Sequence, residues 1–332
     1  MTKITAPKSF EKPEKHIDVL LCHPWYRVLC NLYKSIFDAT NEFYKQENIT
    51  PMLFPVTTGS ISSPMGLGSD SVPIKIEINN QKVYLADSMQ FCLEIGARLS
   101  DKGAYYIMPT FRGEQMDERH LNEFIHSEVE IRGTISDIMN LAEKYIKYMI
   151  SYILKHNESD IISITGTVDH LQSAIEKSFT KISHDQALQE LKDVDDAINS
   201  TGCITKTGEK YLLTKYGDFT WITSLPWKLV PFYQAKQSDE KSAFASDLLA
   251  GIGEILGCGQ RVLSVTDLDE SLKEHNVDKS EYEWYRRMRE ISELQTSGFG
   301  LGIERFILWI LKHDDIRDCA LLLRDHNNIT AP

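Results

Sequence analysis

Apolar residues recur at helical spacing in two long stretches of the chain. From Pro24 to about Tyr44 they fall three or four positions apart, which predicts an amphipathic helix. A second stretch predicts a helix that is capped by Ser136 and runs to about Lys155. The apolar positions are Tyr26, Val28, Leu29, Leu32, Ile36 and Phe37 in the first, and Ile138, Met139, Leu141, Ala142, Tyr145 and Ile146 in the second.

Several shorter stretches have strand character. Residues 49–55 are apolar but contain two prolines, which favours an edge strand because proline cannot donate to a central ladder. Residues 74–85 alternate around Asn79 and Asn80 and predict a hairpin, whereas 57–73 are rich in Ser, Gly and Pro and predict a loop. Other strands are expected at 105–108, 128–131 and 219–223, and other helices at 88–99, 279–293 and 304–311.

The least regular part of the chain lies at about 160–218. Helical pieces at 169–179 and 184–199 stand between polar loops, and we interpret this region as a helical insert. It would interrupt one domain over 17–332, and the polar residues 1–16 are expected to be a flexible lead-in. The alternation of strands and helices indicates an α+β fold.

Composition narrows the class of protein. The 332 residues are 42% hydrophobic and 25% charged, enough for a large core, and no window approaches eighteen apolar residues. The polar N-terminus and six scattered cysteines favour a cytoplasmic protein with reduced thiols and no zinc site. The net charge of −12 lowers the expectation that this chain grips a large nucleic acid by itself.

Two distant segments carry the chemical signal. The first reads Phe-Arg-Gly-Glu at 111–114, Arg-His-Leu-Asn-Glu-Phe at 119–124 and Glu-Val-Glu at 128–130. The second reads Gly-Phe-Gly-Leu-Gly-Ile-Glu-Arg at 298–305. Together they resemble motifs 2 and 3 of the class II aminoacyl-tRNA synthetases. The helix and proline-bearing strand that end at Pro51 resemble motif 1, which in that family forms a homodimer interface.

The resemblance implies a mostly antiparallel sheet flanked by helices and a pocket that joins AMP to a carboxylate. Arginine is well suited to neutralise phosphate, because its planar guanidinium group stays charged and can donate two parallel hydrogen bonds. Arg112 would bridge the α-phosphate and the attacking carboxylate, and Arg305 would cover the adenine and reach the γ-phosphate. The other ATP-binding positions implied are Glu114, Arg119, His120, Phe124, Glu254 and Gly302.

Magnesium is the metal that accompanies such a triphosphate. Asp247 and Glu254 stand seven residues apart across a glycine-rich turn, and hard carboxylate oxygens are what Mg²⁺ requires. The stretch from Asp247 to Arg261 resembles the asparaginyl and aspartyl branch of the family.

The same branch implies an amino-acid pocket made by Ser88, Gln90, Glu94 and Arg261. Aspartyl enzymes carry a lysine three residues after the glutamine, where this chain has Leu93. Leucine cannot neutralise a carboxylate, while Glu94 can accept a hydrogen bond from an amide. We therefore expect asparagine or a close analogue as the substrate.

Departures from the branch leave several functions open. No room for an anticodon-binding OB-fold precedes the motifs, the usual histidine before motif 3 is absent, and the loop at 57–73 lacks the glutamate that usually helps to bind the substrate amine. The layout is similar to that of the archaeal AMP-forming asparagine synthetase. We favour a tRNA-independent ligase using ATP and Mg²⁺. The alternatives are a minimal asparaginyl-tRNA synthetase, an aspartate–ammonia ligase and an inactive regulatory paralogue.

Overall fold

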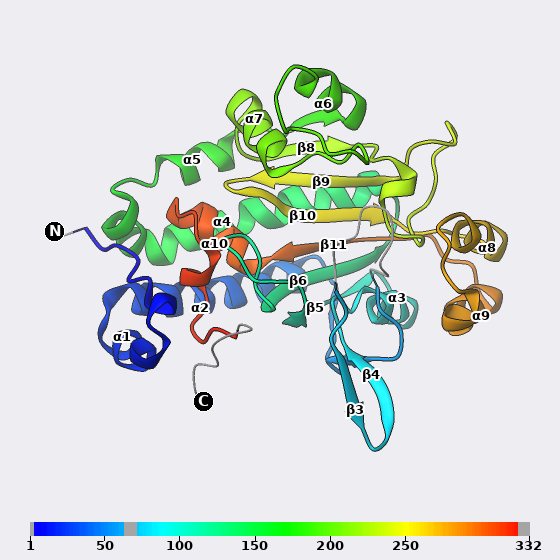
Figure 1. Ribbon diagram of the computed structural model, residues 1–332, viewed down its shortest axis with the longest axis horizontal. Coiled ribbons are helices and arrows are strands. Elements are labelled where there is room, and N and C mark those ends of the chain that lie inside the picture. Colours follow the sequence, from blue (N-terminus) through cyan, green and yellow to red (C-terminus); the bar gives the residue numbers. More distant parts are fainter. Residues whose placement is uncertain (1–2, 63–71, 325–332) are drawn as a thin grey trace.

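One large sheet forms the centre of the molecule in this computed structural model, which describes residues 3–62 and 72–324 (Figure 1). Its eight strands run in the order β1-β5-β6-β11-β10-β9-β8-β7, with antiparallel pairing except at the two edges, where β1 lies parallel to β5 and β7 to β8. The predicted α+β fold is confirmed. The strands are β1 Thr50–Pro51, β5 Gly103–Phe111, β6 Glu123–Arg132, β7 Thr180–Ser183, β8 Thr220–Thr223, β9 Ala245–Ala250, β10 Gly253–Gln260 and β11 Thr296–Gly302.

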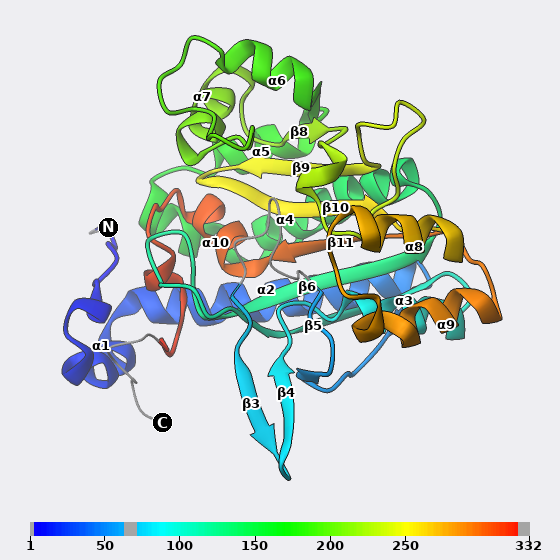
Figure 2. The same ribbon diagram turned by 45° about the vertical axis from the view of Figure 1, so that its right-hand side comes forward.

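A small second sheet projects from the body beside β5 (Figures 1 and 2). It contains β2 Thr57–Thr58, β3 Lys75–Ile78 and β4 Gln81–Leu85 in the order β2-β4-β3. Asn79 and Asn80 make the predicted hairpin turn with φ of 51° and 62°, values that asparagine tolerates well. The rest of the loop predicted over 57–73 lies largely at 63–71, outside the described residues.

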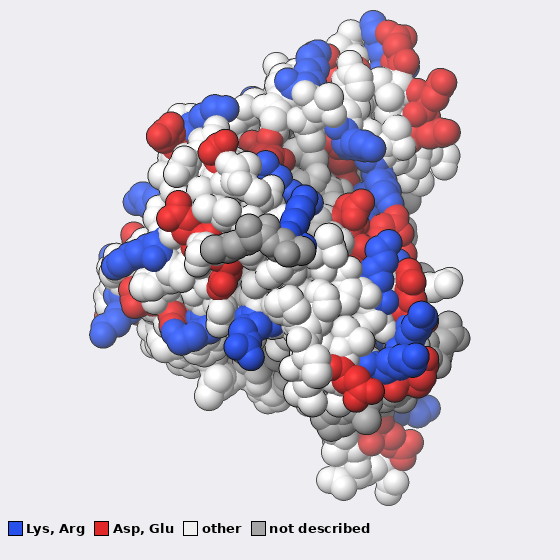
Figure 3. Space-filling view, turned by 90° about the vertical axis from the view of Figure 1, so that its left-hand side faces the viewer, with Lys and Arg blue, Asp and Glu red and all other residues white. Residues whose placement is uncertain are grey.

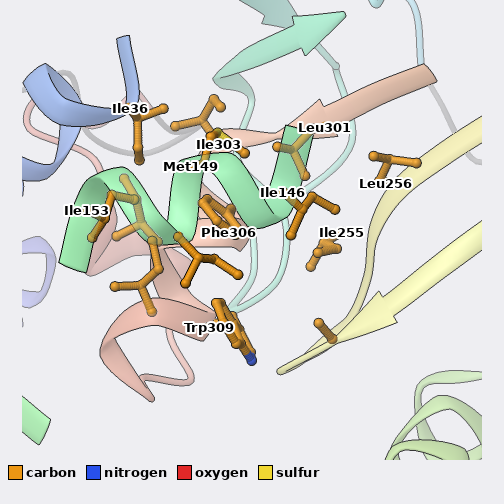
Figure 4. Packing of buried hydrophobic residues seen from close by; sticks show 14 of the residues in the cluster. Ile36, Ile146, Met149, Ile153, Ile255, Leu256, Leu301, Ile303, Phe306 and Trp309 are labelled. Carbon is orange, nitrogen blue, oxygen red and sulfur yellow. The ribbon is translucent and has the colours of Figure 1, made fainter. Parts of the chain in front are cut away.

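Three helices pack on one face of the large sheet and build the main core (Figure 4). These are α2 Pro24–Gln46, α4 Ile135–Thr165 and α10 Ile303–Leu311. Helix α4 begins one residue before the predicted cap, because Thr134 and Asp137 form a capping box, so the assignment of Ser136 as the cap was wrong. It also continues ten residues past Lys155, and ends at Gly166 in the left-handed conformation.

The insert at 160–218 completes the large sheet at its β7 edge, the edge far from β1 (Figure 1). It contributes α5 Asp169–Glu176, the edge strand β7, α6 His184–Leu191 and α7 Lys206–Tyr216. Helix α6 ends at Leu191 rather than at Asn199, and Asp196 within the following turns has a φ of 56°. Apolar side chains of α6 and α7 pack against Ile222 of β8 and Leu249 of β9, so the insert belongs to the same folded body.

Helices α3, α8 and α9 lie at the end of the sheet away from the N-terminus (Figure 2). Helix α3, Gln90–Leu99, packs on β5 and β6, and α8, Val265–Glu274, contacts α9, Glu283–Ile291. The expected helix over 279–293 is thus a short 3-10 turn, Lys279–Tyr282, followed by α9.

The N-terminal stretch is held by specific contacts where a flexible lead-in was expected. Ser9 and His16 are buried, and their side chains lie 2.8 Å apart (Oγ to Nδ1). His16 Nε2 lies 2.8 Å from the carbonyl oxygen of Leu321, and the Lys8 amide donates to Asp318 at 3.1 Å. Lys8 and His16, the first residue of α1 (His16–Cys22), are therefore held by the C-terminal part of the chain, whereas the Ile4 amide donates to the carbonyl oxygen of Ser163 on α4 at 2.9 Å.

Within the described residues, no helix is both long and apolar enough to cross a membrane. All six cysteines are free.

Two isoleucines of α4 provide a matched test of this core. Ile146 is fully buried, whereas Ile162 is 42% exposed. We expect Ile146→Ala to lower the free energy of unfolding by about 2–5 kcal/mol because it leaves a cavity. Ile162→Ala should change it by less than about 1 kcal/mol. Equilibrium urea denaturation measures both, and equal losses would contradict this packing.

Candidate active site

The ATP-binding residues expected from the sequence surround one cavity of about 450 Å³ on the face of the sheet opposite α4. The loop between β5 and β6, the strand β11 and the first turn of α10 supply most of its wall. The expected residues that line it are Arg112, Glu114, Arg119, His120, Phe124, Glu254, Gly302 and Arg305.

The loop that follows β5 is shaped by its own polar side chains. Asn122 donates through Nδ2 to the carbonyl oxygens of Arg112 and Glu114, at 2.8 and 2.6 Å. Asp117 Oδ1 accepts from the backbone amides of Arg119 and His120, at 2.7 and 2.8 Å. These bonds pair the backbone groups of an irregular segment and so fix the backbone positions from which Arg112 and Arg119 extend.

Arg112 and Phe124 lie side by side in the cavity. The guanidinium carbon of Arg112 is 5.5 Å from the centre of the Phe124 ring. Arg112 Nε is buried and has no hydrogen-bond partner among the described residues, so a donor remains available for an anion. The rings of Phe124 and His126 meet edge-on, with their centres 4.8 Å apart. Both rings contribute an aromatic surface to the cavity wall.

Arg305 crosses from α10 toward the hairpin of β9 and β10. Its Nη1 donates to the carbonyl oxygen of Glu254 at 2.6 Å, and Nη2 lies 3.5 Å from that of Arg119. Burial, together with the nearby charges of Arg119 and Arg112, lowers the pKa of Arg305. Burial and the nearby charge of Arg305 also lower the pKa of His120. This crowding of positive charge favours the binding of a polyanion.

Asp247 and Glu254 face each other across the β9–β10 pair. Asp247 Oδ1 and Glu254 Oε1 lie 3.4 and 3.2 Å from where a Cβ on Gly257 would stand. Burial raises the pKa of Asp247 well above its usual value, and the charges of Glu254 and Glu209 raise it further. An added cation would relieve this repulsion.

The described residues contain no cluster of three or more His, Cys, Asp or Glu arranged to hold a metal by themselves. Magnesium commonly takes one or two carboxylates and completes its shell with phosphate and water. The pair of Asp247 and Glu254 fits that mode.

The residues expected to bind the amino acid lie around the start of α3 and just after β10, and none of the four lines the cavity of about 450 Å³. The Ser88 hydroxyl donates to Glu128, with distances of 2.8 and 2.7 Å to its two carboxylate oxygens. Although burial opposes ionisation, bonds from His126, Tyr106 and Ser88 hold the pKa of Glu128 below its usual value. Gln90 Nε2 is buried at the start of α3, close to the Tyr233 hydroxyl.

Glu94 and Arg261 are both buried, and each is already paired. Glu94 is 3.2 Å from Arg289 Nη2 and also accepts from the Tyr285 hydroxyl. Arg261 donates to Glu130 through Nε at 3.0 Å and Nη2 at 2.8 Å. Both ion pairs are thus already formed in the protein without a substrate.

Glycines of β11 make room for these buried carboxylates. Gly298 pairs with Glu130 and Gly300 with Glu128 across the β11–β6 ladder. A Cβ on Gly300 would come within 2.8 Å of Glu128 Oε1, and one on Gly298 would overlap Glu130 Oε2 and approach Arg261 Nη2 to 2.7 Å. The glycine-rich strand is thus required by the acids beside it.

Sequence reasoning missed four residues that organise the site: Glu130, Glu209, Tyr285 and Arg289. The acids at 128 and 130 within an apolar strand were a usable signal, because alternate residues share one face. Arg289 and Tyr285 are four apart on α9, which indicates a shared helix face but not its partner. No pattern in the sequence indicated a role for Glu209 in the site.

Comparison with known proteins agrees with this geometry. A family model described as tRNA synthetases class II (D, K and N) matches residues 15–325. The chain belongs to this family. It is accordingly an AMP-forming ligase of the class II aminoacyl-tRNA synthetase type.

Individual relatives point to one branch of the family. Asparagine–tRNA ligase of Lactobacillus johnsonii is 29% identical over 317 residues, which are 92% of this chain and 72% of the relative. The enzyme of the same name from Thermoplasma acidophilum is 29% identical over 306 residues, or 89% of this chain and 70% of the relative.

A solved structure agrees with this branch. The crystal structure of asparaginyl-tRNA synthetase from Pyrococcus horikoshii, complexed with asparaginyl-adenylate, has a TM-score of 0.88 at 26% identity. The matched region covers 98% of this chain and 74% of the Pyrococcus horikoshii chain.

Glu304 gives the site a pH-dependent contribution to stability. Its buried carboxylate accepts from the Ile125 amide at 3.1 Å, and burial raises its pKa from 4.5 to about 7. A raised carboxyl pKa means that the folded state binds the extra proton, so stability falls as pH rises from 4.5 to 7. Glu304→Gln should remove about 3 kcal/mol of that fall.

Urea denaturation of both proteins at a series of pH values measures this slope. The matched control is Glu123→Gln, at an exposed position of β6. A Glu304→Gln slope equal to that of the unsubstituted protein would contradict the assignment.

Proposed function

We propose that this protein activates the carboxylate of asparagine, or a close analogue, by joining it to AMP. The observation that carries the proposal is the cavity at which Arg112, Arg119 and Arg305 converge beside Glu254. Such a cavity suits a folded triphosphate, because its wall supplies guanidinium donors, an aromatic surface and a metal-ligating carboxylate.

In the proposed reaction a carboxylate oxygen of the amino acid attacks the α-phosphorus of ATP. The new oxygen–phosphorus bond forms as the bond to the β-phosphate oxygen breaks, and pyrophosphate leaves. Arg112 neutralises two anions that would otherwise repel each other, and its unpartnered Nε supplies a donor. Arg119 and Arg305 hold the outer phosphates, and Phe124 supports the adenine. Magnesium, bound at Asp247 and Glu254, would stabilise the charge of the leaving pyrophosphate.

The balance of charge supports asparagine over aspartate. Arg261 is paired with Glu130 and Arg289 with Glu94, so neither of these two buried guanidinium groups is left for a substrate side-chain carboxylate. Leu93 is fully buried in an apolar cluster with Met89 and Tyr106. A neutral amide can bind such a pocket without adding an unpaired charge, whereas aspartate would add one.

The acceptor of the activated acyl group has two candidates. Transfer to tRNA is favoured by the asparagine–tRNA ligases that cover most of this chain. A tRNA-independent acceptor, such as ammonia, an amine or a thiol carrier, is favoured by the net charge of −12. On the face shown in Figure 3, basic and acidic groups are interspersed without a broad basic patch.

We also propose a homodimer through α2 and β1. Phe37 on α2 is 51% exposed, and Leu53, just after the edge strand β1, is 92% exposed. Large exposed apolar side chains are typical of an interface. Sedimentation equilibrium should give twice the mass of 38.0 kDa, and a monomer would refute this part of the proposal.

The test of the proposed function is ATP–pyrophosphate exchange with each of the twenty amino acids. We expect exchange with asparagine and a loss of at least about a hundredfold in kcat/KM with Arg112→Ala. Arg27→Ala, at an exposed position of α2, is the control and should exchange normally. Exchange with aspartate alone would contradict the charge argument and support an aspartate–ammonia ligase.

Charging of total tRNA with labelled asparagine then separates the two acceptors. Charging supports a minimal asparaginyl-tRNA synthetase, and exchange without charging supports a tRNA-independent ligase. No exchange with any amino acid would overturn the proposal and favour an inactive regulatory paralogue.

A further inference from the structure

Helix α7 of the insert reaches the loop that carries the ATP-binding arginines. Its N-terminal cap, Thr205, precedes two charged residues that each pair with that loop. Lys206 pairs with Glu118, and Glu209 pairs with Arg119. The loop and the helix are some ninety residues apart in sequence, so these contacts connect the insert to the triphosphate site.

The two ion pairs differ in their surroundings. The side chains of Lys206 and Glu118 are 57% and 44% exposed, and such surface pairs contribute little. Those of Arg119 and Glu209 are only 9% and 15% exposed, with Nη2 and Oε2 2.5 Å apart. The second pair therefore acts in a poorly solvated environment, where a charge-assisted bond has more influence on geometry.

The backbone beneath this pair leaves no room for a side chain. Gly253, at the start of β10, has a φ of 139°, and both Arg119 Nη2 and Glu209 Oε2 occupy the place where its Cβ would stand. The next residue is Glu254, whose carbonyl oxygen accepts from Arg305. The Arg119–Glu209 pair thus lies directly over the strand that links Arg305 to the metal-ligating carboxylate.

Arg119 retains donors for a ligand while it is held. A guanidinium has five N–H groups, and Glu209 accepts from Nη2 alone. Arg119 Nε is buried without a partner, and the side chain lines the cavity that contains Arg112 and Arg305. Without Glu209, Arg119 would lose this ion pair while Arg112 and Arg305 remain in the same cavity.

We propose that Glu209 is a positioning residue that holds the Arg119 fork toward the triphosphate of ATP. The inference rests on the proposed function and gives the insert a role in it. Glu209 also borders a smaller cavity of about 170 Å³ that contains Asp247 and Glu254, so it adds a third negative charge beside the magnesium ligands. Burial and the charge of Glu254 accordingly raise the pKa of Glu209, while Arg119 opposes the rise.

Glu209→Gln tests the proposal because it keeps the shape and removes the charge. The matched control is Glu190→Gln, which breaks a surface pair with Lys215 in the same insert. Binding of α,β-methylene ATP with Mg²⁺ is measured by isothermal titration calorimetry, and KM for ATP and for asparagine by exchange. Thermal unfolding checks that each variant is folded.

We expect Glu209→Gln to weaken binding of the analogue and to raise KM for ATP about tenfold, the scale of one charge-assisted hydrogen bond. KM for asparagine should stay unchanged, and Glu190→Gln should behave as the unsubstituted protein. Because Glu209 acts through Arg119, adding Glu209→Gln to Arg119→Ala should weaken binding no further.

Unchanged binding by folded Glu209→Gln, or full additivity in the double variant, would overturn the inference. An equal rise of both KM values would also overturn it, since that result indicates general disruption. If the unsubstituted protein binds the analogue but catalyses no exchange, the proposed function fails alone, and the binding comparison still decides the role of Glu209.

Discussion

Compensation of buried charge is the constraint on which the rest of this structure depends. Strand β6 places Glu128 and Glu130 on the active-site face of the sheet, where both are at most 4% exposed. Leaving either acid without partners would cost several kcal/mol. Gly298 and Gly300 on β11 leave the space, while Arg261, His126, Tyr106 and Ser88 supply the partners.

The cavity proposed to bind ATP has an excess of positive charge on one side. Three guanidinium groups, those of Arg112, Arg119 and Arg305, converge there, and Arg119 donates to Glu209 while Arg305 donates to the backbone carbonyl of Glu254. On the other side, Asp247 and Glu254 repel each other in a buried setting. A magnesium–triphosphate complex matches both surfaces, since its phosphates face the arginines and its cation faces the acids. Under the proposed function, the paired charges near α3 would favour a neutral amide, and the arginine-lined cavity would favour a triphosphate.

Local patterns in the sequence predicted much of the framework. The helical spacing of α2 and the alternation around Asn79 are local signals, and the structure confirms both elements. The eight residues expected around ATP meet at one cavity, and seven of them come from the two motifs, with Glu254 from the stretch between Asp247 and Arg261. The assignment of each residue's role remains a prediction.

The errors have two physical origins, a local capping box and contacts between distant segments. Thr134 displaced Ser136 as a cap because Asp137 completes its capping box. The lead-in is held by residues near 318 and 321, which no local pattern could indicate. Glu209 reaches Arg119 only because α7 packs across the end of the sheet, so its place in the site depends on tertiary structure.

The central claim is that paired buried charges make the amino-acid pocket neutral and therefore selective for an amide. The most direct measurement compares the Kd of two non-hydrolysable sulfamoyl adenylate analogues, one of asparagine and one of aspartate, by isothermal titration calorimetry. The account predicts that the asparagine analogue binds at least about a hundredfold more tightly, because only the aspartate analogue adds an unpaired buried charge. Equal affinities, or tighter binding of the aspartate analogue, would contradict it.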